Sequence, residues 1–222
     1  MLLDLSYSIT VVDTIFFEHE LNTIYAEVPQ AKERLTVHIG DIRDERLIKS
    51  TLTPDVVGVI NLAAVSRVLW CLENGPDCED VNVRGTDLIL QQLSNQYSDR
   101  PSLPWFIQAS SREVYGSADV ALVTEDTPRI PANVYGSSKL RAEEVIERFV
   151  STLSQTQGSP AFHSIALRLS NVYGGEFDHR ERLIPSIMTQ AIAHRTIQIV
   201  GGHQDVSPTL LAPRGNAHLS LA

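Results

Sequence analysis

Short apolar runs rich in β-branched residues alternate along this chain with longer segments of helical periodicity. Several of the short runs are apolar throughout, which is typical of strands whose sheet is covered by helices on both faces. The alternation predicts an α/β fold built on a parallel sheet. We expect strands at residues 9–13, 35–39, 56–61, 105–109, 164–169 and 197–200, and helices at residues 80–95 and 135–155.

The composition is that of an ordinary globular protein, with 222 residues of which 43% are hydrophobic and 20% are charged. This length suits one domain, or one domain and a fragment of another. The formal net charge is −9 and no block is rich in lysine or arginine, so we expect neither nucleic acid nor a membrane as a partner. No apolar run approaches ~20 residues and the N-terminus lacks the features of a secretory signal, so we expect a cytoplasmic protein.

Neither the cysteines nor the histidines have the spacing of a metal site. Cys71 and Cys78 are the only cysteines, and their separation matches no metal-binding or redox motif. We therefore expect two buried or idle thiols in a reducing compartment. The seven histidines are scattered along the chain, so no metal is expected.

The strongest chemical signal in the chain is the run Tyr-Gly-Ser-Ser-Lys at residues 135–139. Residues four apart on a helix share one face, so the side chains of Tyr135 and Lys139 should lie close together. A nearby ammonium lowers a tyrosine pKa from its usual value near ~10, which suits proton exchange with a substrate hydroxyl. A second run, Ser-Ser-Arg-Glu-Val-Tyr-Gly at residues 110–116, supplies Ser111 after a predicted strand, where open parallel sheets place their ligands.

Taken in order, these and several further motifs resemble the extended short-chain dehydrogenase/reductase family, which includes nucleotide-sugar epimerases, dehydratases and decarboxylases. The resemblance covers about residues 1–209. It implies a Rossmann-like doubly wound parallel sheet, NAD as cofactor and a nucleotide sugar as substrate, and it allows a homodimer formed through the helices at 80–95 and 135–155. The further motifs are Ile-Thr-Val-Val-Asp at 9–13, Gly-Asp-Ile-Arg at 40–43, Asn-Leu-Ala-Ala-Val-Ser at 61–66, Asn-Val-Arg-Gly-Thr at 82–86, Thr-Glu-Asp-Thr-Pro at 124–128 and Arg-Leu-Ser-Asn-Val-Tyr-Gly at 168–174.

The resemblance gives roles to the three central residues. Tyr135 would be the acid/base of the reaction, and Lys139 would lower its pKa and bind the nicotinamide ribose. Ser111 would hydrogen-bond the reacting sugar hydroxyl; the alternative for Ser111 is a turn serine at the end of a strand. The implied chemistry is removal of a hydride from a sugar carbon by NAD, which leaves a ketone intermediate.

Asp13 is the best clue to the identity of the cofactor. In the family a carboxylate after the second strand accepts both hydroxyls of the adenosine ribose and repels the extra phosphate of NADP, so NAD is favoured. Asp41 would meet the adenine through its side chain; the alternative for both residues is an aspartate in a surface turn. By the same resemblance the cofactor would contact Ile42, Leu62, Ala63, Ala64 and Asn82, although an asparagine at the start of a helix commonly caps it.

Arg112 and Glu113 bear on the type of reaction. At this place family dehydratases resemble Asp-Glu, decarboxylases often show Ser-Glu, and 4-epimerases usually carry small or neutral residues. Arg112 lacks the proton-donating role of the dehydratase aspartate, which disfavours a 4,6-dehydratase and leaves epimerase and decarboxylase open. Glu113 would be a second acid/base beside the sugar, or else one half of a solvated pair. Asn171 resembles a residue that contacts the substrate diphosphate, and Arg168 is expected to be structural.

Two departures from the family pattern bear on whether this chain is active. The first glycine is Gly40, so the first strand and the glycine-rich phosphate loop that follows it are expected to be missing. Their loss would open two edges inside the sheet and leave the chain unstable or incomplete. Most of the C-terminal substrate domain is also expected to be missing. We predict a partial cofactor-binding domain at residues 1–175, the start of a substrate-binding region at 176–209 and a divergent tail at 210–222.

Two classes of function remain at this point. The first is an NAD-dependent nucleotide-sugar epimerase/dehydratase whose Ser-Tyr-Lys site is inactive or impaired in the truncated chain. The second is a non-catalytic family remnant that acts as a binding protein or has no activity. A reductase acting on a carbonyl outside a nucleotide sugar is a third option, against which Asn171 argues.

Overall fold

A computed structural model of the chain describes residues 7–16, 18–117, 122–173, 183–193 and 210–211. By packing, the chain divides into two compact units, Met1–Arg168 and Leu169–Ala222. The first unit includes both the serine run and the Tyr-Gly-Ser-Ser-Lys run. The division falls shortly before residue 175, the predicted limit of the cofactor-binding domain.

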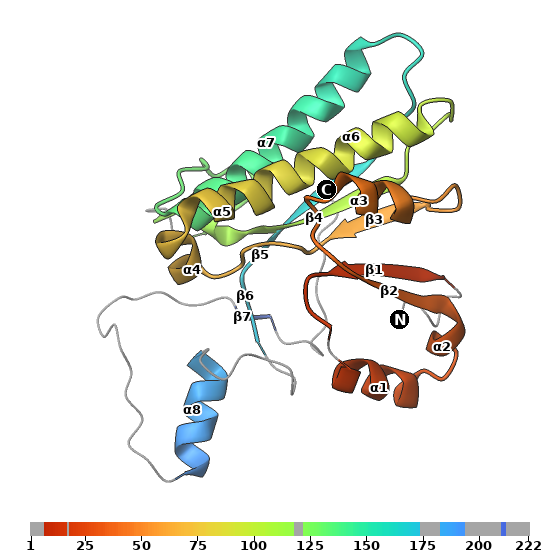
Figure 1. The fold of residues 1–222 in the computed structure, drawn as a ribbon. Helices are drawn as coiled ribbons and strands as arrows, with labels where there is room; N and C mark the ends of the chain where they lie inside the picture. Colours follow the sequence, from red (N-terminus) through yellow and green to blue (C-terminus); the bar gives the residue numbers. More distant parts are fainter. Residues whose placement is uncertain (1–6, 17, 118–121, 174–182, 194–209, 212–222) are drawn as a thin grey trace. The chain divides into compact units, whose positions relative to one another are not determined.

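The first unit is built on parallel strands flanked by helices, as the sequence predicted (Figure 1). β1 (Ile9–Asp13) pairs in parallel with β2 (Leu35–Ile39), and β3 (Gly58–Asn61) pairs in parallel with β4 (Trp105–Ser111). β5 (Ser164–Leu169) lies next to β4. Among the described residues these strands form two separate sheets, β1-β2 and β3-β4-β5, so β1 and β3 each have an edge without a strand partner.

Most of the predicted strands are confirmed, three of them to the residue. β3 begins at Gly58, later than predicted, and β4 continues through Ser110 to Ser111. The longer β4 corrects the expectation that Ser111 follows the strand, because Ser111 is its last residue. The strand predicted at 197–200 lies outside the described residues.

The two long predicted helices are present with local differences. The segment 80–95 begins as a π-helical turn, η1 (Asp80–Arg84), and continues as α6 (Gly85–Tyr97). The segment 135–155 is α7 (Val134–Gln155). The shorter helices are α1 (Glu18–Glu27), α2 (Ala31–Arg34), α3 (Glu45–Thr51), α4 (Val68–Glu73), α5 (Gly75–Glu79) and the 3-10 turn η2 (Arg112–Tyr115).

The main core of the first unit is formed by α3, α6, α7 and the strands β3 and β4. α6 and α7 run side by side over β4 (Figure 1). Leu90, Leu93 and Phe106 are fully buried, and the hydroxyl of Tyr97 donates to the carbonyl of Thr53 at 2.6 Å. Burial of each such apolar side chain contributes about 1.5–3 kcal/mol. This packing fixes α7 against β4, the two elements that carry the predicted catalytic residues.

The second unit contains β6 (Asn171–Val172), which pairs in parallel with β7 (Leu210–Leu211), and α8 (Leu183–Ile192). The two residues of β7 fall at the start of the predicted divergent tail. The rest of that tail and most of the predicted substrate-binding region, residues 176–182, 194–209 and 212–222, lie outside the described residues.

The prediction of two free thiols is wrong, because Cys71 and Cys78 form a disulfide. Both residues are fully buried, as expected. α4 ends at Glu73 and α5 begins at Gly75, and this change of direction brings the two Cα atoms to 5.2 Å, within the range that a disulfide spans. The expected cytoplasmic location stays a prediction and loses the support that free thiols would have given.

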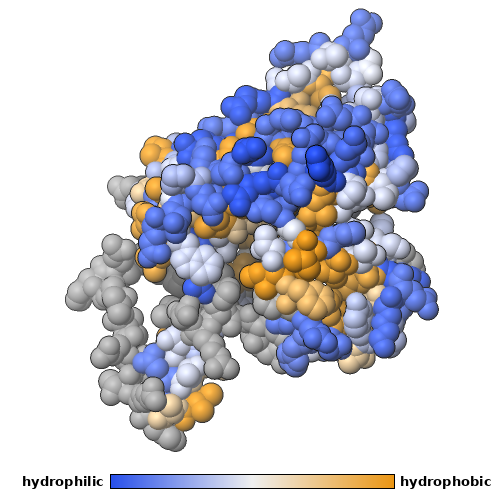
Figure 2. Space-filling model, viewed as in Figure 1, coloured by the Kyte–Doolittle hydropathy of each residue, from blue (hydrophilic) through white to orange (hydrophobic). Residues whose placement is uncertain are grey.

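The surface of the first unit differs between its helical side and its strands. Figure 2 shows mostly hydrophilic side chains over α6 and α7 and apolar side chains gathered near β1 and β2. Exposed apolar residues at or near the strand ends include Ile15, Phe16, Ile39 and Ile60. Within the described ranges no helix has the length and apolar character needed to cross a membrane.

Candidate active site

The carboxyl end of β4 is held in place by buried polar side chains. Asn61 on β3 donates its amide to Gln108 on β4 at 2.9 Å and to Thr86 on α6 at 3.1 Å. All three are nearly inaccessible to water, and unpaired they would each cost about 1–3 kcal/mol, so the contacts fix β3, β4 and α6 in one register. Three residues further along β4, Ser111 accepts the backbone N–H of Glu113 at 3.2 Å and caps η2.

The start of α7 lies directly against η2. Asn133 caps α7 by accepting the N–H of Gly136 at 2.8 Å. A Cβ on Gly136 would overlap the carbonyl oxygen of Glu113 and lie 3.0 Å from its carbon. Because backbone cannot move aside as a side chain can, only glycine permits this approach. The approach brings Tyr135 on α7 next to the segment that begins with Ser111.

Lys139 is buried beneath Tyr135, with 3% of its surface exposed. Its ammonium donates to the carbonyl of Ala109 on β4 at 2.8 Å and lies 5.9 Å from the centre of the Tyr135 ring. Burial lowers the pKa of Lys139 to about 8, because the charged form loses its hydration. The structure therefore places Lys139 beside Tyr135 and against β4, the strand that ends at Ser111.

Glu113 contacts the cap of α7. Its carboxylate accepts a hydrogen bond from the side-chain amide of Asn133 at 2.8 Å. Sequence reasoning missed Asn133, although an asparagine two residues before the tyrosine of a helical motif is a usual capping signal. Arg112 is half-buried in the first turn of η2. The roles predicted for Arg112 and Glu113 toward a substrate stay predictions.

A buried ionic network, also missed, lies one helical turn beyond Lys139. Glu143 on α7 is 2% exposed and accepts from Ser110 on β4 and from Arg129 at 3.2 Å. It also accepts from Arg168 on β5, whose Nη2 donates at 2.8 Å. Burial alone would raise the pKa of Glu143, but these hydrogen bonds hold that pKa below its usual value. Arg168 donates further to the hydroxyl of Tyr115 at 2.7 Å, so its expected structural role is supported.

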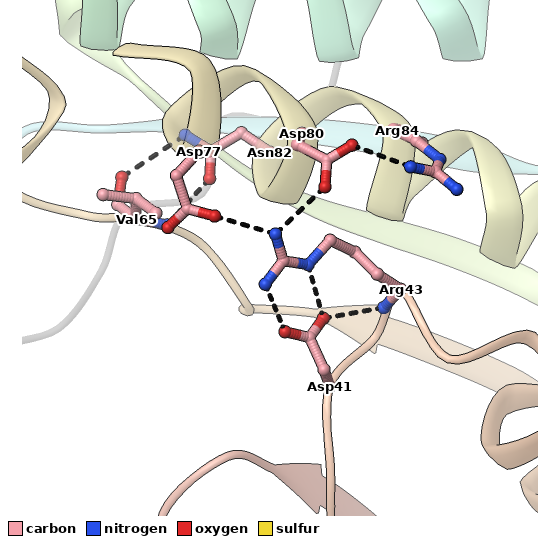
Figure 3. Close-up of polar contacts among 7 residues, drawn as sticks. All are labelled: Asp41, Arg43, Val65, Asp77, Asp80, Asn82 and Arg84. Atoms are coloured by element: carbon pink, nitrogen blue, oxygen red, sulfur yellow. Dashed lines mark hydrogen bonds and ion pairs between the residues drawn. The ribbon is translucent and has the colours of Figure 1, made fainter. Parts of the chain in front are cut away.

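The residues predicted to meet the adenosine lie at the ends of β1 and β2. Asp13 is exposed at the end of β1 and accepts the N–H of Ile15 at 3.0 Å. Asp41 follows β2 and receives two hydrogen bonds from the guanidinium of Arg43, at 2.6 and 3.0 Å (Figure 3). These bonds lower the pKa of Asp41, so its carboxylate is ionised. Ile42 belongs to the core, which leaves its backbone as the part able to meet a cofactor.

The segment after β3 forms the next part of the predicted cofactor wall. Leu62 is 70% exposed, and Ala63 and Ala64 are half-buried. Asn82 is 1% exposed, and its amide is occupied by the backbone of Val65 and the hydroxyl of Ser138. Asn82 therefore holds this segment in place through the backbone of Val65.

Asn171 lies in the second unit. It is the first residue of β6, is exposed, and is paired in register with Leu210. Its predicted contact with a substrate diphosphate stays a prediction. Within the described ranges no group of three or more histidine, cysteine or acidic side chains could hold a metal ion.

Comparison with known proteins places these features in a family. The family model for GDP-mannose 4,6 dehydratase matches residues 1–208. The low-salt glycan biosynthesis protein Agl12 of Haloferax volcanii is 30% identical over 167 residues, which are 75% of this chain and 49% of that protein. A UDP-glucose 4-epimerase of Corynebacterium glutamicum is 26% identical over 224 residues, which cover 99% of this chain and 62% of that protein.

The fold is also found among solved structures. A double mutant of DesIV, a dTDP-glucose 4,6-dehydratase of Streptomyces venezuelae crystallised with NAD and DAU bound, matches with a TM-score of 0.78 and 25% identity. The match covers 95% of this chain and 62% of that one. The chain thus spans between 49% and 62% of the length of these three proteins.

Proposed function

This chain belongs to the GDP-mannose 4,6-dehydratase family of extended short-chain dehydrogenases/reductases, and we propose that Ser111, Tyr135 and Lys139 form the site at which it oxidises a hydroxyl of a nucleotide sugar with NAD. The observation that carries this proposal is the burial of Lys139 between the Ala109 carbonyl and the Tyr135 ring. A chance surface pair would leave the ammonium in water. A lysine whose pKa is lowered to about 8 beside a tyrosine is instead typical of a functional site.

Each of the three side chains has a distinct task in this mechanism. Ser111 holds the reacting sugar hydroxyl by a hydrogen bond. Tyr135 takes the proton from that hydroxyl at its phenolic oxygen, and the charged Lys139 favours the deprotonated phenol. NAD, when bound, supplies the hydride acceptor. Lys139 keeps most of its charge below about pH 8, so the site is in its working state near neutral pH.

The residues at the strand ends fit NAD. Asp13 is exposed at the end of β1, where its carboxylate would accept the hydroxyls of the adenosine ribose. The same carboxylate would repel the extra phosphate of NADP, so we propose NAD over NADP. The exposed Leu62 offers an apolar surface for a flat ring. The solved dehydratase named above was crystallised with NAD, which supports the same assignment.

The substrate is proposed to be a nucleotide sugar, because the relatives act on such compounds by name. Arg112 and Glu113 bear on which reaction is carried out. Glu113 is engaged by Asn133, which fits a supporting role at least as well as direct proton transfer. An arginine as its neighbour offers no proton near neutral pH, so we propose epimerisation or decarboxylation ahead of dehydration. The product formed from a labelled sugar nucleotide distinguishes these reactions.

The test is turnover of a sugar nucleotide, because epimerisation and decarboxylation return the hydride to the sugar and leave no net reduced cofactor to measure. The purified chain is mixed with NAD and, in turn, UDP-glucose, dTDP-glucose, GDP-mannose and UDP-glucuronate, the last of which carries the carboxylate that a decarboxylase requires. We expect a new sugar nucleotide, separated by chromatography, from at least one of them, and a fall of at least ~100-fold in its rate of formation for Tyr135→Phe, in line with the contribution of general acid–base catalysis. Tyr7→Phe, at a tyrosine 45% exposed near β1, is the matched control and should leave the rate unchanged.

The rival function, a non-catalytic member that binds a partner or has no activity, is supported by the separate β1-β2 and β3-β4-β5 sheets. Absence of a product from all four sugar nucleotides in the unmodified chain would favour this rival. A rate in Tyr135→Phe equal to that of the unmodified chain would reject the mechanism.

We also propose that the protein forms a homodimer through α6 and α7. These two long helices lie side by side, and such a pair can pack against its copy as a four-helix bundle. Sedimentation at micromolar concentration tests this, and a monomer would reject it.

A further inference from the structure

The segment from α5 through η1, residues 75–84, contacts three parts of the proposed site that are far apart in sequence. Its C-terminal part, Asp80–Arg84, is a π-helical turn, and such turns are rare and frequently found at functional sites. The side chains of this segment point in two directions, toward the turn after β2 and toward the segment after β3 (Figure 3).

The first contact is made through Arg43. Its Nη1 donates to Asp77 at 2.8 Å and to Asp80 at 3.0 Å, while its Nη2 and Nε hold Asp41 (Figure 3). One guanidinium therefore joins the turn after β2 to α5 and η1. Asp80 also accepts from Arg84 at 3.1 Å, which orients its carboxylate.

Stability alone does not explain this cluster. The side chains of Asp77 and Asp80 are 57% and 35% exposed, and ion pairs this open to water contribute about 0–1 kcal/mol each. A planar guanidinium with three carboxylate partners is, however, fixed in both position and orientation. The contribution of the cluster is therefore geometric.

The second contact starts two residues further along the same π-helical turn. Asn82 accepts the N–H of Val65 at 2.8 Å and donates to the hydroxyl of Ser138 on α7 at 2.8 Å. Ser138 lies beside Lys139, and its own hydroxyl donates to the carbonyl of Tyr135 at 2.8 Å. One turn thus connects the segment after β2, the segment after β3 and the catalytic helix.

We propose that Asp77 and Asp80 are positioning residues for the adenine end of the cofactor site. They act through Arg43, which they lock in the orientation that presents Asp41, and neither touches the cofactor itself. This inference rests on the proposed function, since it assigns a task to residues around the proposed NAD site. It extends that function by adding a rigid support that no single motif in the sequence contains.

The test uses the double variant Asp77→Asn/Asp80→Asn, which removes the charge from both carboxylate partners, weakens the two cross-links and keeps the contact between Arg43 and Asp41. NAD and AMP are anions, so loss of two negative charges by itself should tighten their binding. Loss of positioning should instead weaken the binding of both ligands by about fivefold to tenfold, which is opposite to the effect of charge alone. The matched control, Asp55→Asn/Asp99→Asn, removes the same charge at two exposed positions of the first unit and should bind at least as tightly as the unmodified chain.

Calorimetry with NAD and AMP gives the affinities, and amide hydrogen exchange gives a readout that needs no ligand. In the double variant, exchange at residues 40–43 should be faster by about tenfold, with little change in the middle of α7. Equal or tighter NAD binding together with unchanged exchange would overturn the inference. No NAD binding by the unmodified chain would instead count against the proposed function, and the exchange at residues 40–43 would still decide the inference.

Discussion

Replacing Glu143 with glutamine should destabilise the first unit strongly, because this buried carboxylate joins three elements. It accepts hydrogen bonds from Ser110 on β4, Arg168 on β5 and Arg129. Glu143→Gln keeps the size of the side chain, removes its charge and turns an amide toward the two guanidinium groups. The side chain of Arg168 is only 19% exposed, and in this variant it would lose the carboxylate that Glu143 provides.

The magnitude follows from burial. Removing one partner of a buried ion pair typically costs about 3–5 kcal/mol, because the remaining charge is left without compensation. Arg168 keeps its contacts with Tyr115 and the Glu125 carbonyl, and Arg129 keeps Glu147. These remaining contacts place the expected loss at the lower end, about 3 kcal/mol.

Urea unfolding followed by tryptophan fluorescence measures the loss, since Trp105 lies on β4 with Ser110. The matched control is Glu147→Gln, one helical turn further along α7. Glu147 also pairs with Arg129, at 2.7 Å, but its side chain is 57% exposed, so its loss should cost less than about 1 kcal/mol.

The pH dependence gives a second check. The pKa of Glu143 is lower in the folded protein than its ordinary value of 4.5, so its stabilising effect is complete above pH 4.5 and is lost as the pH falls through the folded pKa. The difference in stability between the unmodified chain and Glu143→Gln should therefore shrink below pH 4.5. A loss no greater than that of Glu147→Gln, or a difference that stays constant on acidification, would refute the reasoning.

Three further predictions concern the site and its surroundings. Gly136→Ala should abolish detectable turnover and destabilise α7, because the new Cβ would overlap the Glu113 carbonyl; unchanged thermal unfolding would contradict the close approach. Lys139→Met should abolish turnover yet raise stability at pH 7 by up to about 3 kcal/mol, since the pKa is lowered from 10.5 to about 8 and the ammonium is a cost below pH 8. That gain should disappear as the pH rises from 8 to 10.5, and a constant gain in urea titrations would argue against it. Under denaturing conditions without reductant, an alkylating agent should add no mass to the chain, and labelling at Cys71 or Cys78 would disprove the disulfide.

The strands were predictable because their signal is local. A run such as residues 9–13 is short and rich in β-branched residues, and these properties do not depend on what packs against it. The Tyr135–Lys139 pair was predictable for a similar reason, since the helical repeat alone puts residues four apart on one face. Resemblance to a family then joined this pair to Ser111, and the matched family model confirmed the family.

The errors share a common cause, which is that they depend on contacts between distant segments. Cys71 and Cys78 looked like free thiols because nothing in their spacing shows that the chain turns between α4 and α5. The segment after residue 80 looked like ordinary helix, although its first residues form a π-helical turn. The contacts of Asn82 with Val65 and Ser138 were likewise not visible from its motif, while its assignment to the cofactor stays a prediction.

The sequence by itself determined the order of strands and helices, the family, and the three residues proposed for catalysis, because periodicity and short motifs are properties of neighbouring residues. Only the tertiary structure decided how Lys139 is buried, which carboxylates surround Arg43, and how Glu143 joins β4, β5 and α7. Burial and ion pairing arise between segments that are far apart in the chain. Their effects on charge and geometry therefore become visible only when the chain is folded.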